Sequence, residues 1–205
     1  MKKTLIFFLA FFLLCNLAAP FPKGNIENPE VSWNLTIGDI STDLVRADVN
    51  EDGEKETIFG VGNVLYAQNG NETLWRSFLG SDMNRETTPR VLEFSSSKGK
   101  ELLVGAGENV YLLNSTGGTI WRNHLSSVIT CPPVKVKGNG ENMVFLTTNY
   151  PVLLDNKGEI TNTNEDIEAR NIIKYGGSEE TLLTGIEEIK SLEIPGLSTR
   201  WSKEG

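Results

Sequence analysis

From residue 31 onward the chain alternates short apolar stretches with turns rich in glycine and asparagine. The segments 89–94 and 133–137 alternate apolar and polar residues, which is the period of a strand with one buried face. No stretch after residue 30 repeats apolar residues at helical spacing. The pattern therefore predicts an all-β domain over residues 31–205.

Two segments of this domain share one skeleton of strands and turns. Each begins at a glutamate, passes a Gly-x-Gly turn and an aromatic strand, and ends in Trp-Arg. The starting residues Glu56 and Glu101 lie 45 positions apart, and Trp75 and Trp121 lie 46 apart. A weaker copy over 143–160 lacks the tryptophan, whereas the copy over 180–201 restores it. Such self-similarity is typical of a repeat protein.

Four short strands in each 40–45 residues, separated by glycine and asparagine turns, are typical of a β-propeller blade. The predicted fold is all-β: a partial or small β-propeller of about four four-stranded blades. The predicted units are 43–79, 89–125, 132–163 and 169–202. A β-sandwich is the alternative, but it does not explain why a tryptophan recurs at the same position of the repeated unit.

The segment Val110–Trp121 resembles the tryptophan-docking motif of PQQ-type quinoprotein propellers, and 65–75 is a shortened version. The loop 48–56 resembles the calcium loop of FG-GAP (VCBS) propeller repeats. The resemblance implies that each tryptophan packs flat between neighbouring blades; the residues concerned are Trp33, Trp75, Trp121 and Trp201. Propellers of these families usually have more than four blades. The chain is therefore expected to close tightly, to self-associate, or to form an incomplete propeller.

The first residues have the layout of a secretory signal peptide. Two lysines precede an apolar run over 4–14, and small residues follow at Ala18 and Ala19. The run is shorter than the roughly 20 residues that a spanning helix needs. We expect a signal peptide over 1–19, a linker over 20–30, and a secreted or cell-surface protein. An uncleaved anchor is the alternative, because Leu17 and Pro20 suit cleavage after Ala19 poorly.

The two cysteines limit the redox chemistry of the chain. Cys15 would be the lipidated residue of a lipoprotein, but Leu14 stands where the lipobox requires a small residue. With the signal removed, Cys131 is the one remaining cysteine, so no intramolecular disulfide is expected. The expected state of Cys131 is a buried, inert thiol.

The formal net charge of the whole chain is −8, which disfavours partners that are themselves anionic. Nucleic-acid binding needs clustered lysine and arginine, and the same holds for docking on anionic lipid. The expected partner is a protein or glycan that the sequence does not identify. Membrane association is expected only if the N-terminal segment is retained.

The most specific chemical signal is the acidic loop after the first strand of the domain. Oxygen-bearing side chains at alternate positions can surround one hard cation, and Gly53 allows a sharp turn between them. The predicted Ca²⁺ ligands are Asp48, Asn50, Asp52, the backbone carbonyl of Glu54 and Glu56. The alternative is a solvated acidic turn. In the next unit serines replace the carboxylates, so Glu93, Ser95, Ser97 and Glu101 predict no second ion.

Catalytic motifs are scarce. His124 is the sole histidine, and no Gly-x-Ser-x-Gly elbow or phosphate-binding loop occurs. The predicted function is therefore an exported, non-catalytic binding or scaffold module with one structural calcium. The alternatives are a remnant or subunit of a quinoprotein-type enzyme, or a lipoprotein component of an outer-membrane assembly machine. Three sequons also permit glycosylation of an exported chain, at Asn34, Asn71 and Asn114.

Overall fold

The computed structural model describes residues 38–95, 99–169, 172–175, 181–185 and 188–204. The predicted signal peptide, the linker, Trp33 and the sequon at Asn34 lie outside these residues.

The described residues form sixteen strands and one short 3₁₀ helix, η1 (Arg85–Thr87). Blade 1 contains β1 (Val45–Ala47), β2 (Glu56–Val61), β3 (Val64–Asn69) and β4 (Glu72–Phe78). Blade 2 contains β5 (Arg90–Leu92), β6 (Glu101–Ala106), β7 (Asn109–Leu113) and β8 (Thr119–His124). Blade 3 contains β9 (Val134–Gly138), β10 (Glu141–Thr147), β11 (Pro151–Leu154) and β12 (Ile160–Thr163). Blade 4 contains β13 (Ile172–Tyr175), β14 (Thr181–Gly185), β15 (Glu188–Glu193) and β16 (Ser198–Glu204).

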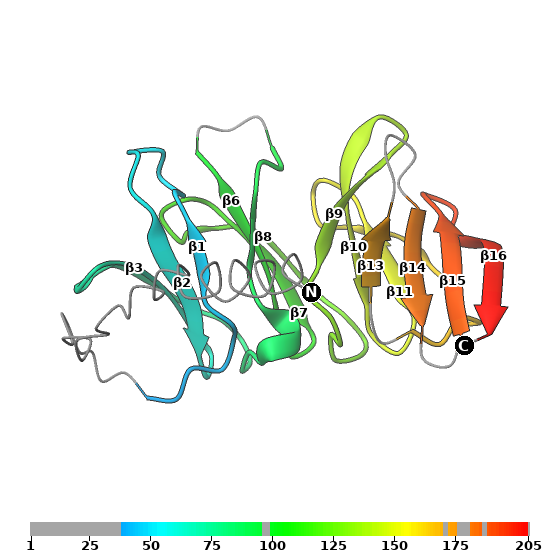
Figure 1. The fold of residues 1–205 in the computed structure, drawn as a ribbon, viewed down its shortest axis with the longest axis horizontal. Coiled ribbons are helices and arrows are strands. Elements are labelled where there is room, and N and C mark those ends of the chain that lie inside the picture. The colour runs from blue at the N-terminus through cyan, green and yellow to red at the C-terminus, as the bar shows by residue number, and fades with distance from the viewer. Residues whose placement is uncertain (1–37, 96–98, 170–171, 176–180, 186–187, 205) are drawn as a thin grey trace, which may run out of the picture. The chain divides into compact units, whose positions relative to one another are not determined.

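Each blade is a four-stranded antiparallel sheet whose strands pair in chain order (Figure 1). Two-residue turns join β2 to β3 and β6 to β7, and a turn this short makes the two strands that it connects pair with each other. Gly62 and Gly107 begin the turns between the second and third strands of blades 1 and 2, with φ of 55° and 57°. Two-residue hairpin turns require positive φ, which glycine adopts without a steric penalty. The Gly-x-Gly motifs of the sequence thus end in hairpin turns.

Three hydrophobic clusters join the blades in series. The first combines Ile58 and Leu65 of blade 1 with Leu102 and Tyr111 of blade 2. The second joins blade 2 to blade 3, and the third joins blade 3 to blade 4. Each fully buried aliphatic side chain contributes about 1.5–3 kcal/mol relative to exposure. The interfaces between blades therefore supply much of the stability that no single sheet has alone.

An indole ring fastens each of the first two interfaces. Trp75 on β4 donates from Nε1 to the carbonyl oxygen of Ser115 in the next blade, at 2.9 Å. Its ring covers Gly117, where a Cβ atom would lie 2.6 Å from the ring. Trp121 on β8 covers Gly158 in the same way, and a Cβ there would lie 2.5 Å away. Glycine at these turns lets the ring pack directly against the backbone.

The last two blades differ from the first two at the register position of this tryptophan. Trp75 pairs with Ala67 and Trp121 with Leu112, each next to a register shift. In blade 3 this position is Asn162, whose side chain donates to the carbonyl oxygens of Pro195 and Gly196 in blade 4. In blade 4 it is Trp201, which pairs with Ser191 and is 47% exposed.

The tryptophan–glycine contact predicts a large effect of a single methyl group. Gly158→Ala should lower the free energy of unfolding by about 3 kcal/mol, since it adds a clash with Trp121 to the strain of a positive φ. Gly140→Ala is the matched control, because Gly140 has the same φ of 82° and open space around it. The control should lose only about 1 kcal/mol in urea unfolding. Equal losses for the two variants would contradict the packing role of the indole.

Candidate functional site

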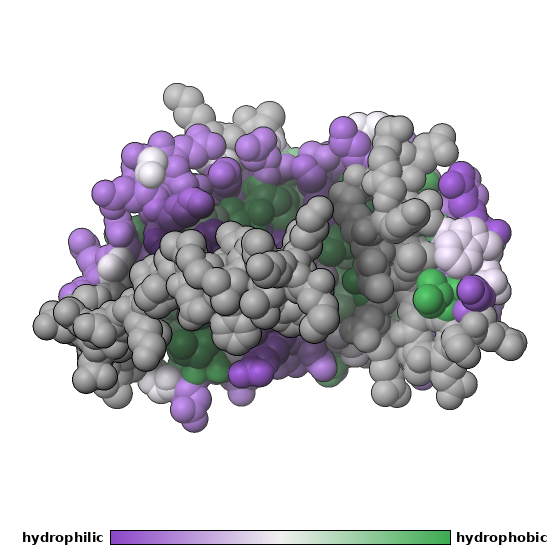
Figure 2. Space-filling view, viewed as in Figure 1, coloured by the Kyte–Doolittle hydropathy of each residue, from purple (hydrophilic) through white to green (hydrophobic). Residues whose placement is uncertain are grey.

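The predicted calcium loop connects β1 to β2 and lies in a hydrophilic region at the upper left of the surface view (Figure 2). Asp48 accepts backbone N–H bonds from Asp52 at 3.2 Å and from Gly53 at 3.0 Å. Asn50 Oδ1 accepts a second bond from Asp52 N at 3.1 Å. The three side chains thus turn inward on one short loop, which is also how a solvated acidic turn is built.

The structure places Glu54 and Glu56 differently from each other. The Glu54 backbone N–H donates to Asp52 Oδ1 at 2.8 Å, and its carboxylate accepts a bond from Asn69 of the neighbouring turn. Glu56 begins β2 and is fully buried. Its Oε2 accepts the backbone N–H of Val49 at 2.8 Å, whereas its Oε1 has no hydrogen-bond partner. The described residues contain no cluster of three acidic, histidine or cysteine side chains arranged to hold a metal.

Blade 2 repeats the buried glutamate without the acidic loop. Glu101 Oε2 accepts the backbone N–H of Phe94 at 2.7 Å and of Ser95 at 2.9 Å. The Ser95 hydroxyl donates to Glu101 Oε1. The glutamate therefore ties the loop between the first two strands to the start of the second strand. Glu56 was predicted only as a metal ligand, although the recurrence of glutamate at the same phase of the repeat signals this structural role.

His124 and Cys131 have structural neighbours. His124 Nε2 lies 3.7 Å from Glu108 Oε2, and its Nδ1 lies 3.3 Å from Asn109 Oδ1. Cys131 is buried, and the Thr147 hydroxyl donates to its sulfur at 3.0 Å. Burial raises the pKa of the Cys131 thiol above its ordinary value, and the bond from Thr147 offsets part of that rise.

The two sequons within the described residues lie on turns between the third and fourth strands. Asn71 is exposed beside Gly70 in the turn of blade 1. Asn114 is exposed in blade 2, but its Oδ1 accepts bonds from Thr116 N and Gly118 N. Within the described ranges, no helix combines the length and the apolar character that crossing a bilayer requires.

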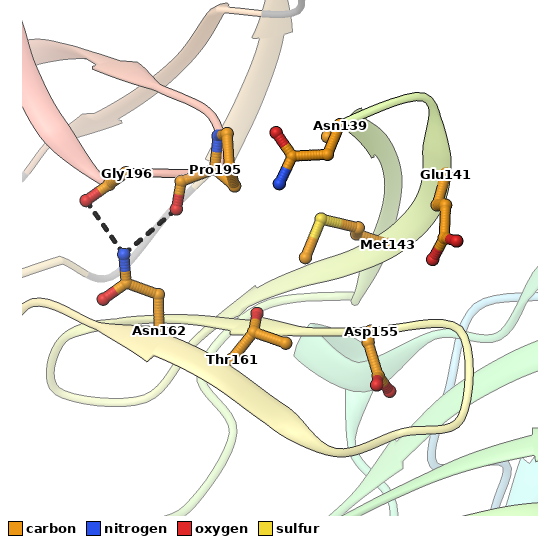
Figure 3. A pocket seen from close by; sticks show the side chains of 9 residues that line it. Asn139, Glu141, Met143, Asp155, Thr161, Asn162, Pro195 and Gly196 are labelled. Carbon is orange, nitrogen blue, oxygen red and sulfur yellow. Dashed lines mark hydrogen bonds between the residues drawn. The ribbon is translucent and has the colours of Figure 1, made fainter.

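A cavity at the interface of blades 3 and 4 is lined by none of the predicted site residues. It has a volume of about 450 Å³ and lies where blade 3 meets blade 4, beside Asn162 (Figure 3). The available signal was the missing tryptophan of the third repeat, since a smaller side chain at a packing position that holds tryptophan in the first two repeats leaves space.

Comparisons with known proteins show the fold. A scan against protein families finds no match, and a search of curated proteins finds none. Sqt1 from Saccharomyces cerevisiae matches with a TM-score of 0.64 and 13% identity, over 82% of this chain and 52% of that chain. BBS1N in complex with ARL6DN matches with a TM-score of 0.59 and 15% identity, over 82% and 58%. BamB from Moraxella catarrhalis matches with a TM-score of 0.51 and 16% identity, over 80% and 51%.

These matches and the four antiparallel sheets confirm the predicted fold class, a partial or small β-propeller of four four-stranded blades. The chain spans only slightly more than half the length of each of these three solved structures.

Because its pKa is raised, Cys131 should remain protonated near neutral pH and react slowly with alkylating reagents. At pH 8 iodoacetamide should modify it at least about tenfold more slowly in the native protein than in urea. Mass spectrometry of the peptide that contains Cys131 measures this rate separately from any reaction at Cys15. Similar rates in both states would contradict the burial of this thiol.

Proposed function

We propose that this protein is an exported, non-catalytic binding or scaffold module, built from PQQ-like and FG-GAP-like propeller repeats with one structural calcium. The observation that carries the proposal is the outer face of blade 4, which presents core positions of the repeat to solvent. On this face Trp201 is 47% exposed and Ile189 is 45% exposed.

The register shows why these two positions belong to a core. The cross-strand partner of the tryptophan is Ala67 in blade 1, Leu112 in blade 2 and Ser191 in blade 4. The residue two positions before this partner lies on the same face of the sheet. It is Leu65 in blade 1, Val110 in blade 2 and Ile189 in blade 4. Leu65 and Val110 are fully buried, because the next blade covers them. A face with this apolar pattern and without a covering blade is a docking surface for another protein element.

We infer that a second copy of this chain is the partner that covers this face. Two copies would bring together eight blades, and a single copy spans only slightly more than half of the propeller chains that it matches. Trp201 would then contact a turn of the partner, as Trp75 contacts Gly117 within the chain. A different protein partner is the alternative, and the matched BBS1N structure is itself a complex with ARL6DN.

The non-catalytic assignment rests on the Cys131 thiol, which is buried and kept protonated by its raised pKa and is therefore a poor nucleophile. The other candidate, His124, has Glu108 and Asn109 as its neighbours. A quinoprotein remnant remains the enzymatic alternative, and quinone absorbance in the purified protein would favour it.

The calcium assignment is supported by the buried oxygen of Glu56. In blade 2 the corresponding Oε1 of Glu101 receives the Ser95 hydroxyl, whereas Glu56 Oε1 has no partner. A cation beside the loop would satisfy it, and a carboxylate oxygen can accept an N–H bond and still coordinate a metal. Asp48, Asn50 and Asp52 would contribute the other side-chain oxygens.

Export is proposed from the sequence over 1–19. A cleaved chain beginning near residue 20 would support secretion, and a lipidated N-terminal Cys15 would instead favour the outer-membrane lipoprotein interpretation. The intact mass of the exported protein distinguishes these two outcomes, and it also reports glycosylation at Asn34, Asn71 and Asn114.

Self-association through blade 4 predicts a mass that depends on concentration. Light scattering should show a two-copy species at high protein concentration, and Trp201→Ser should shift it to one copy. Ile120→Ser is the control, because Ile120 is apolar and 45% exposed but lies on β8 of blade 2, which is not a terminal blade. A single-copy mass at every concentration, or equal effects of the two substitutions, would refute the second copy as partner.

Calcium binding predicts a higher thermal stability that chelation removes. Calcium at about 100 times its dissociation constant stabilises the folded state by about 2.7 kcal/mol, which raises the unfolding midpoint by several degrees. Asp52→Asn should abolish the rise, since it removes a ligand charge but keeps an oxygen for the Glu54 N–H. The control is Glu93→Gln in the blade 2 loop, and this variant should retain the calcium-dependent rise in the midpoint. If calcium leaves the thermal unfolding midpoint of the unaltered protein unchanged, the proposed calcium site is contradicted.

A further inference from the structure

Side chains at one position of the last strand bridge each blade to the next. The position lies two residues after the tryptophan, or two after Asn162 in blade 3. Each of these side chains donates a hydrogen bond to the backbone carbonyl oxygen of a turn residue in the next blade. The pairs are Ser77 with Gly117, Asn123 with Gly158 at 2.6 Å, and Asn164 with Leu197 at 2.9 Å. A donor at this position is therefore part of each interface between the described blades.

Blade 4 has Lys203 at the donor position, two residues after Trp201. The side chain of Lys203 is exposed, whereas Ser77, Asn123 and Asn164 are half-buried in their interfaces. A lysine ammonium group is a hydrogen-bond donor that lies farther from the backbone than a serine hydroxyl or an asparagine amide. The acceptor that suits Lys203 is therefore a turn that lies farther from the last strand than the turns within the chain.

Blade 1 has the shortest of the four turns between third and fourth strands. Only residues 70–71 separate the paired residues Asn69 and Glu72. The corresponding turns are longer and comprise residues 114–118 in blade 2, 155–159 in blade 3 and 194–197 in blade 4. A shorter turn keeps its carbonyl oxygens farther from a strand docked beside the blade. The long donor of blade 4 thus matches the short turn of blade 1.

The same turn of blade 1 is surrounded by negative charge. Glu72 is exposed at its end, and the exposed Glu54 carboxylate accepts a hydrogen bond from the Asn69 side chain. Opposite charges within a few ångströms attract each other, and at an interface they also select the partner. The charge of this turn therefore favours the ammonium group of Lys203.

The outer face of blade 1, which is the face turned away from blade 2, has the residues of a face that receives another blade. In blade 2 the receiving face includes Tyr111, whose hydroxyl accepts the backbone N–H of Gly80 from blade 1 at 2.7 Å. Tyr66 has the register position of Tyr111 and pairs with Arg76, as Tyr111 pairs with an arginine of β8. Phe78 lies two residues after Arg76, on the same face, and is 69% exposed.

The accessible part of this outer face is its β3–β4 side. Phe59 on β2 is 3% exposed and stacks on Tyr66 with ring centroids 5.5 Å apart. The β3–β4 side is also where each interface forms its donor bond, because the acceptor belongs to the turn between the third and fourth strands. We define the docking strip of blade 1 as Tyr66, Arg76, Phe78 and the turn 70–71.

We propose that blade 4 of one copy docks on the docking strip of blade 1 in a second copy, and that the reciprocal contact closes a ring of eight blades. Trp201 covers the turn 70–71, and Lys203 donates to a carbonyl oxygen of this turn beside Glu72. Two equal head-to-tail contacts related by a two-fold axis form a closed ring. The inference rests on the proposed self-association and identifies the surface that the outer face of blade 4 meets.

The dissociation constant of the two-copy species, measured by analytical ultracentrifugation of the full exported protein, tests the charge pairing. Lys203→Glu and Glu72→Lys should each weaken association at least about tenfold, because each places like charges in both contacts of the ring. The variant with both substitutions should recover most of the affinity, since the charges are exchanged. Glu159→Lys is the matched control, because Glu159 is exposed and has the register position of Glu72 in the turn of blade 3. It should leave the dissociation constant unchanged.

The apolar part of the docking strip is tested with Phe78→Ser. This substitution should weaken association as Trp201→Ser does, whereas Ile120→Ser on blade 2 should not. A two-copy species that Glu72→Lys and Phe78→Ser leave unchanged would overturn the proposal, since the blade 4 faces would then dock on each other or elsewhere. A glycan on Asn71 of the exported protein would also overturn it, because the glycan would cover the turn.

Failure of this inference is distinct from failure of the proposed function. A single-copy mass of the unaltered protein at every concentration refutes the second copy itself. A two-copy mass that depends on Trp201 but not on the docking strip refutes only the head-to-tail ring.

Discussion

The first two interfaces between blades share one repeated contact, an indole ring that lies on the backbone of a turn glycine in the next blade. Trp75 covers Gly117 and Trp121 covers Gly158, and in each case a single methyl group would not fit between them. The contact fixes the distance and the angle between adjacent sheets, since a rigid ring allows no slack against a backbone. The buried aliphatic clusters between blades are packed around this constraint.

The last two blades depart from this contact. Blade 3 replaces the tryptophan with Asn162, which bridges to blade 4 by two hydrogen bonds and leaves a cavity beside them. Blade 4 keeps Trp201 but exposes it. The first departure leaves a cavity lined by residues of both blades, and the second leaves an indole ring partly exposed to solvent. Both departures result from sequence changes in the third and fourth units of the repeat.

The buried glutamate of the acidic loop has a structural role that recurs in blade 2. Glu56 ties the loop to β2 through the Val49 N–H, as Glu101 does at Phe94 in a blade without acidic neighbours. The buried carboxylate is therefore a structural feature of the repeat first. Only its second oxygen, which has no partner in blade 1, distinguishes the loop that could hold a cation.

The sequence by itself determined the strands, the four-unit repeat and the phase of the tryptophans, because period-two alternation, turn glycines and recurring spacing are local properties of the chain. It also identified His124, Cys131 and the loop around Asp48 as the residues with chemical potential. Only the tertiary structure showed that Asn162 faces Gly196, that Glu56 is buried, and that Trp201 is exposed. These facts depend on contacts between blades some forty residues apart, and spacing alone does not report what lies across an interface.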